Sequence, residues 1–179
     1  MIIALLVSVA AILLVPAAAA SLRGRTARVR TAVDLIGRVR PLDWAAFRNL
    51  TDPGEEEYLR RNLSSRNFRV VQRARLGAAA AYVRLAAANA AVLLRLAEAA
   101  RESSDAAVAE AGAALSQQAL RLRMLSLMTL LKIGTAWVWP GGQLPWPELI
   151  ESYEDVAGTA TRLGRLQQPA RASAVYSVF

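Results

Sequence analysis

Hydrophobic residues at the start of the chain form one uninterrupted run. Residues 2–20, IIALLVSVAAILLVPAAAA, contain no charged side chain. At 1.5 Å per residue a helix over this run would span roughly 28 Å, which is close to the hydrocarbon thickness of a bilayer. Pro16 is compatible with a membrane helix, because neighbouring groups there can satisfy the backbone that a kink frees. The pattern predicts a single transmembrane helix within residues 1–22.

Basic residues follow the apolar run at once, in the segment SLRGRTARVR. Arginines beside a membrane helix resist translocation, so the positive-inside rule places the C-terminal domain in the cytoplasm. We therefore expect a single-pass protein of the cell membrane. Anionic lipid headgroups attract basic side chains next to the bilayer, so we expect the lipid surface to be one partner. The predicted membrane-surface residues are Arg23, Arg25, Arg28 and Arg30.

A cleaved signal peptide is the competing interpretation of the same run. Ala18-Ala19-Ala20 offers an acceptable A-x-A cleavage site. Against cleavage, the basic segment that usually precedes the apolar core of a signal peptide is missing, because apolar residues follow Met1 directly. A retained anchor is favoured, and an exported protein is the alternative.

Helical spacing continues beyond the anchor. Residues 23–40 are predicted as a basic juxtamembrane helix, in which the helical pattern runs from Arg25 to Arg38 and Pro41 stops it. Asp43 then suits the N-cap of a short helix over residues 44–50. In the next start signal, Asp52-Pro53-Gly54-Glu55, we expect an N-cap, a proline at the first helical position and a capping box.

Two long helices are predicted in the centre of the chain, one after Ser64-Ser65 to about Glu102 and one from about Ala106 to Trp139. The break between them is so short that they are expected to form an antiparallel hairpin. The first of them carries an apolar stripe that includes Asn89, a polar residue that needs a partner if it is buried. The predicted stripe consists of Val71, Ala78, Leu85, Val92 and Ala99, with Ala74, Ala81 and Leu96 beside them.

A last amphipathic helix is predicted from Glu148, after the breaker sequence PGGQLPWP. Its apolar face comprises Leu149, Ile150, Tyr153, Val156, Ala160 and Leu163. The helical domain therefore covers residues 41–167, and residues 168–179 form a tail. The predicted fold class is all-α: an N-terminal membrane helix, then a helical domain built on the long hairpin, with shorter flanking helices.

The segment from Met124 to Trp139 is apolar nearly all round. Such a helix is buried in a core, packed against a partner or in contact with lipid. A second membrane span is disfavoured, because the segment is short and Lys132 near its middle would cost about 2.5 to 3.5 kcal/mol in the bilayer. Core packing and partner contact both stay open. The candidate partner contacts are Met124, Leu127, Met128, Leu131, Trp137 and Trp139.

Composition excludes several kinds of chemistry. The chain contains no cysteine and no histidine, which rules out disulfides, thiol catalysis, Cys/His zinc sites and a histidine general base. No phosphate-binding loop or dinucleotide motif is present, and we expect no cofactor, no metal and no catalytic residue. The net charge is +8, but aromatic residues are not interleaved with the arginines, so nucleic acid is not an expected partner.

The sequence thus favours a non-enzymatic, membrane-tethered helical module that binds a protein partner or self-associates. One alternative is the exported helical protein with a cleaved signal peptide. The other is a membrane-associated enzyme that uses Lys132, near Ser126 and Thr129 at helical spacing, or the glutamates of the last helix.

Overall fold

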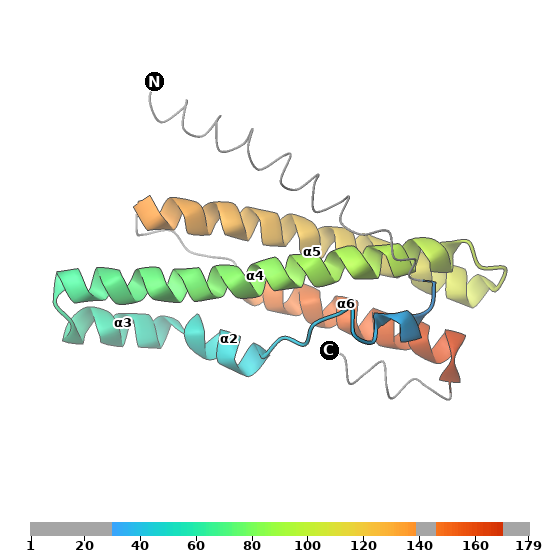
Figure 1. Ribbon diagram of the computed structural model, residues 1–179, viewed down its shortest axis with the longest axis horizontal. Helices are drawn as coiled ribbons and strands as arrows, with labels where there is room; N and C mark the ends of the chain where they lie inside the picture. Colours follow the sequence, from blue (N-terminus) through green and yellow to red (C-terminus); the bar gives the residue numbers. More distant parts are fainter. Residues whose placement is uncertain (1–29, 139–145, 170–179) are drawn as a thin grey trace, which may run out of the picture.

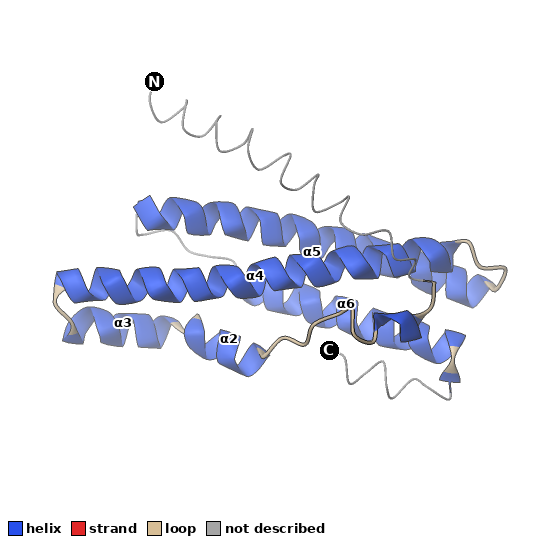
Figure 2. Cartoon of the chain, in the orientation of Figure 1, coloured by secondary structure: helices blue, strands red, loops and turns tan. Residues whose placement is uncertain are grey.

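The structure, a computed structural model, describes residues 30–138 and 146–169. Every regular element in this part is a helix (Figures 1 and 2), which confirms the predicted all-α class for these residues. The elements are η1 (Ala32–Leu35), α2 (Trp44–Leu50), α3 (Pro53–Asn62), α4 (Ser65–Arg101), α5 (Ala106–Val138) and α6 (Trp146–Gln167). The predicted membrane helix, Arg23, Arg25, Arg28, Trp139 and the tail from residue 170 lie outside the described residues.

The long helices α4 and α5 lie side by side over most of their length (Figure 1). Asp105 begins α5 by accepting hydrogen bonds from the backbone N–H groups of Ala107 and Val108, at 2.8 and 3.4 Å. Near this turn α4 and α5 approach closely. A Cβ atom built on Gly112 of α5 would lie only 2.8 Å from Cβ of Ala100 on α4. Helix α6 packs chiefly against α5, and α2 and α3 contact α4.

Local capping chemistry sets the starts of the shorter helices. The carboxylate of Asp43 accepts the Ala46 N–H at 2.9 Å, as predicted for α2. Asp52 caps α3, and Pro53 takes its first position. The predicted capping box with Glu55 was wrong, because the backbone N–H of Asp52 donates instead to the Asn49 carbonyl at 3.3 Å.

The described part of the predicted juxtamembrane helix differs from a continuous helix. It contains the 3-10 turn η1, and Gly37 then takes a left-handed conformation with φ of +78°. The Asp34 carboxylate accepts the backbone N–H groups of Arg30 and Thr31, each at 2.9 Å. These two hydrogen bonds, first that of Arg30, hold the pKa of Asp34 below its usual value. A side chain that bonds to nearby backbone in this way favours a turn over a helix.

The core-facing side of α4 coincides with the predicted stripe only in part: Leu96 is buried, and Leu85 and Val92 are partly buried against the core. Ala78 and Ala81 are exposed, whereas Val83 and Ala90 are fully buried. The buried residues of α4 are Leu76, Ala79, Ala80, Val83, Ala86, Asn89, Ala90, Leu93, Leu96, Ala97 and Ala100. Alanine is apolar and small on whichever side it lies, so an alanine-rich helix carries little information on which face turns inward. By contrast, the predicted apolar face of α6 is buried at all of its positions, from Leu149 to Leu163.

Among the described residues, α4 is the one helix that is long and apolar enough to cross a membrane. Within its most apolar stretch, 44% of the residues are buried inside the protein. The core helix of a compact bundle meets the same criterion of length and composition. Its contacts with α2, α3, α5 and α6 place α4 in the middle of this bundle.

Candidate functional site

Five large hydrophobic side chains on α5 are exposed together. Their exposed fractions are 50% for Leu120, 58% for Met124, 38% for Leu127, 51% for Met128 and 43% for Leu131. Spacings of four, three, one and three residues place them on one side of the helix. At 1.5 Å per residue they extend over about 17 Å. We call these five residues the α5 apolar face.

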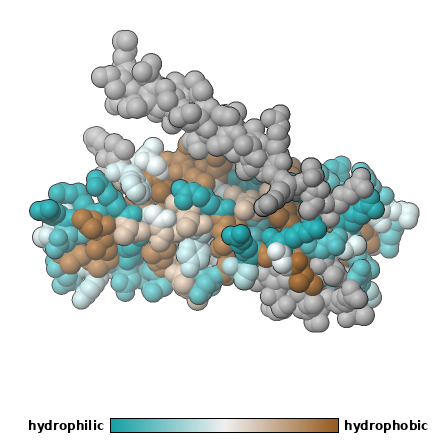
Figure 3. Space-filling model, in the orientation of Figure 1, coloured by the Kyte–Doolittle hydropathy of each residue, from teal (hydrophilic) through white to brown (hydrophobic). Residues whose placement is uncertain are grey.

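The opposite side of the same helix faces the core. Leu115, Leu122, Ser126, Thr129 and Ile133 are each at most 3% exposed. The segment from Met124 onward, which is apolar nearly all round in sequence, is therefore divided into a buried side and an exposed side. In Figure 3 hydrophobic colour is visible in the middle of the upper edge, at the level of α5, and also in patches lower in the view.

The structure brings four of the predicted partner contacts together, namely Met124, Leu127, Met128 and Leu131. Trp137 is 49% exposed, but at 100° per residue it points away from the α5 apolar face. Leu120 was missed by the sequence reasoning, although its position four residues before Met124 extends the same spacing. Of the four predicted membrane-surface arginines, Arg30 is the one that the structure describes, and it is exposed.

Cations flank the α5 apolar face. Helical spacing places Arg121 and Lys132 on one side of it and Arg123 on the other. From residue 111 to residue 138 the helix contains no aspartate or glutamate. Within the part of the chain that the structure describes, none of these three cations forms an ion pair. The face is thus an apolar strip bordered by positive charge.

The structure does not assemble a serine–lysine dyad on α5. Ser126 and Thr129 are fully buried, whereas Lys132 is exposed. The Thr129 hydroxyl donates to the Leu125 carbonyl at 2.7 Å, within its own helix. In the described residues the Ser126 hydroxyl has no hydrogen-bond partner. A nucleophile activated by a lysine would need the two groups within hydrogen-bond reach.

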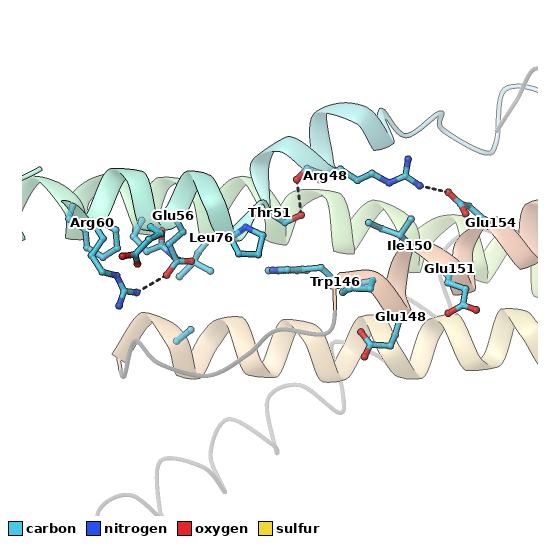
Figure 4. Close-up of a pocket in the computed structure, with 16 residues that line it drawn as sticks. Arg48, Thr51, Glu56, Arg60, Leu76, Trp146, Glu148, Ile150, Glu151 and Glu154 are labelled. Carbon is cyan, nitrogen blue, oxygen red and sulfur yellow. Dashed lines mark hydrogen bonds and ion pairs between the residues drawn. The ribbon is translucent and has the colours of Figure 1, made fainter. Parts of the chain in front are cut away.

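A broad groove of about 1060 Å³ opens between α3, α4 and the start of α6 (Figure 4). Its apolar lining includes Leu76, Trp146 and Ile150. Five carboxylates and two guanidinium groups surround that lining, so the groove is acidic. They belong to Glu56, Glu57, Glu148, Glu151, Glu154, Arg48 and Arg60.

Two ion pairs lie at the groove, one between α2 and α6 and one within α3. Arg48 contacts Glu154 at 2.7 Å and Arg60 contacts Glu56 at 2.9 Å. These side chains are between 38% and 58% exposed, so each pair contributes little to stability. In the described ranges, no group of three Asp or Glu side chains is placed to hold a metal ion. The described carboxylates of the groove form a solvated surface rather than an assembled centre.

A polar network lies inside the bundle at Asn89. Its side-chain oxygen accepts the Arg40 N–H at 3.0 Å, and its amide group donates to the Arg40 carbonyl at 2.8 Å and to the Tyr153 hydroxyl at 3.0 Å. The prediction that a buried Asn89 needs partners is confirmed. Burial raises the pKa of Tyr153 to about 12, and the hydrogen bond from Asn89 opposes part of that rise. This tyrosine is held neutral and serves the packing of the bundle.

No known protein-family model matches the sequence, and no curated protein or solved structure matches it either. A functional proposal for this chain therefore depends on its own residues and their geometry. Of the features described above, the α5 apolar face is the one that places five exposed large hydrophobic side chains next to one another.

Proposed function

We propose that this protein is a non-enzymatic helical interaction module, tethered to the cell membrane by residues 2–20, with its helical domain on the cytoplasmic side. The observation that carries the proposal is the α5 apolar face. Five large hydrophobic side chains lie next to one another on a helix whose opposite side is packed into the core.

Isolated hydrophobic side chains on a surface are ordinary, but a contiguous row of them marks a contact site. The leucines and methionines of this face lie outside the core, because the described residues bury the opposite side of α5. The two methionines, Met124 and Met128, have flexible and polarisable side chains that adapt to differently shaped partners. These properties support an interaction surface.

The described residues that follow the proposed tether are attached to the helical bundle. After the last predicted membrane-surface residue, Arg30, the chain is fixed at two points. The Ala32 N–H donates to the Gln167 side chain on α6 at 2.9 Å, and Arg40 bonds to Asn89 on α4. From Ala32 onward the described chain is therefore held against the helical bundle.

The tether and its orientation are tested with a dual reporter fused after Phe179, fluorescent in the cytoplasm and active as a phosphatase only outside it. We expect fluorescence without phosphatase activity, and retention in the membrane fraction after an alkaline wash. Deleting residues 2–20 should abolish the retention that survives the alkaline wash. Phosphatase activity together with an N-terminus shortened at Ala20 would contradict the proposal in favour of the exported alternative.

The interaction surface is tested by placing a photo-crosslinking residue at Met128, with a matched variant at Asp155, an exposed position on α6. In cells, position 128 should give far more crosslinked product, to protein or to lipid, than position 155. Equal and low yields at the two positions would contradict an occupied α5 apolar face.

A further inference from the structure

We propose that the α5 apolar face docks onto the surface of an anionic lipid bilayer, so that the helix lies along the membrane with its flanking cations among the lipid headgroups. The inference rests on the proposed tether, since the same membrane would hold residues 2–20. The proposed function does not say what binds the α5 apolar face, and the inference assigns that role to lipid.

The arrangement of charge around the face favours lipid. Helices that lie in a membrane interface combine an apolar side with basic residues at its borders, which reach toward the headgroups with their long side chains. Arg121, Arg123 and Lys132 occupy both borders of the α5 apolar face, and α5 carries no acid from residue 111 to residue 138. An anionic surface would meet attraction along the strip and no repulsion from residues 111–138 of α5; Glu110, the one carboxylate of this helix, lies ten residues before Leu120.

The acidic residues of the domain lie on other helices or at the ends of the hairpin. Glu55, Glu56 and Glu57 belong to α3, which forms the lower edge of the bundle in Figure 1, while α5 forms its upper edge. Helix α6 carries a further group of acids around the groove: Glu148, Glu151, Glu154 and Asp155. A bilayer against α5 would leave the acidic surface of α3 facing away from the headgroups.

The same charges disfavour a second copy of this chain as the occupant. In a symmetric dimer each α5 apolar face would meet an identical one. The cations at the borders would then face cations, because α5 offers no carboxylate between residues 111 and 138 to pair with them. Like charges placed together oppose association.

The length of chain before the domain permits this contact. Residues 21–29 lie between the uncharged run and Arg30, the first described residue. Nine residues can extend to at most about 32 Å. This length allows the domain to turn until α5 meets the bilayer in which the run would be anchored.

The natural absence of cysteine allows a clean test with single labels. Met128→Cys and, as the matched control, Asp155→Cys are introduced into the full chain, and each is labelled with an environment-sensitive fluorophore. Each protein is reconstituted in vesicles of phosphatidylcholine alone or of phosphatidylcholine with phosphatidylserine, both with brominated acyl chains that quench on contact. We expect a blue-shifted, quenched signal at position 128 in the anionic vesicles and a solvent-like signal at position 155 in both.

Charge variants then test the headgroup contact. Each cation near an anionic leaflet favours the bound state by about fivefold, the equivalent of ~1 kcal/mol. Arg121→Gln with Lys132→Gln should therefore lower the ratio of docked to undocked label by roughly 25-fold. Arg73→Gln with Arg84→Gln removes the same charge from exposed positions on α4, and should leave the ratio nearly unchanged. Circular dichroism verifies that each variant keeps its helix content.

The outcomes separate this inference from the tether. A full chain that fails to float with vesicles of either kind would contradict the tether, and the inference with it. A chain that floats, but whose label at position 128 is quenched no more than the label at position 155, would overturn the inference alone. Disulfide crosslinking between two unlabelled copies of the Met128→Cys variant, equal in both lipids, would also overturn it and assign the face to self-association.

Discussion

The side-chain amide of Asn89 on α4 donates a 3.0 Å hydrogen bond to the hydroxyl of Tyr153 on α6, and each of the two residues is only 1% exposed. Asn89 also bonds to both backbone groups of Arg40, so one side chain joins the N-terminal stretch, α4 and α6. A buried polar group that loses its partners costs about 1 to 3 kcal/mol. The network therefore determines how these three segments meet.

Asn89→Ala should lower the free energy of unfolding by about 2 to 3 kcal/mol, because Tyr153 and the Arg40 backbone lose their partner in the interior. Denaturant unfolding of the full chain in mild detergent, followed by circular dichroism, measures the change. Asn67→Ala is the matched control, since Asn67 is exposed on the same helix, and should change stability by less than about 0.5 kcal/mol. Equal effects of the two substitutions would contradict a structural role for the network.

Stability should fall in alkaline solution through Tyr153. In the unfolded chain its phenol ionises near pH 10, whereas burial raises the pKa to about 12 in the folded protein. The unfolded state therefore releases this proton first, so the contribution is complete below pH 10 and is lost as the pH rises to about 12. The loss amounts to about 2 to 3 kcal/mol.

Unfolding experiments across that pH range, with the ultraviolet absorbance of tyrosinate as a second measurement, test this pH dependence. Tyr153→Phe is the control and should flatten the fall in stability between pH 10 and 12. An equally steep fall in the phenylalanine variant would assign the pH dependence to other groups.

Two glycines in the long helices should respond to alanine in opposite directions. A Cβ on Gly112 would lie 2.8 Å from Cβ of Ala100 and 2.9 Å from the backbone nitrogen of Arg101, so Gly112→Ala should force α4 and α5 apart and cost about 1 to 3 kcal/mol. A Cβ on Gly77 meets nothing within 4 Å. Gly77→Ala should therefore stabilise the protein by about 0.5 to 1 kcal/mol through helix propensity. Thermal unfolding of the two variants checks the opposite signs, and a stabilising Gly112→Ala would show that the helices are not in close contact there.

The starts of α2 and α3 were predictable because capping is local chemistry, whereas α6 begins at Trp146, two residues before its predicted start at Glu148. The side chains of Asp43 and Asp52 accept hydrogen bonds from backbone N–H groups two or three residues further along the chain, and Pro53 follows Asp52 directly. Such near neighbours can be read from a single sequence. The partners of Asn89 were not predictable, since Arg40 is 49 residues away and Tyr153 is 64 residues away. One sequence shows that a buried amide needs partners, but it does not show which distant segment supplies them.

Four of the five members of the α5 apolar face were predictable, whereas Leu120 was missed and the predicted Trp137 points away from the face. Helical spacing groups Met124, Leu127, Met128 and Leu131 in advance. Which side of α5 is covered depends on where α4 and α6 pack, and the sequence after Met124 is apolar on nearly every side. The inward face of α4 was unpredictable for the same reason, because its alanines satisfy several stripes equally well.

Two leucines on opposite sides of α5 test whether the apolar face lies outside the core. Leu122 is fully buried, whereas Leu131 is 43% exposed. Leu122→Ala removes core contacts and should lower the free energy of unfolding by about 2 to 5 kcal/mol. Leu131→Ala should cost less than about 1 kcal/mol, because much of its side chain already contacts solvent. Urea unfolding of the full chain in detergent compares the two. A cost at Leu131 as large as that at Leu122 would mean that the α5 apolar face is already covered in the isolated protein, and that no external partner is needed to explain it.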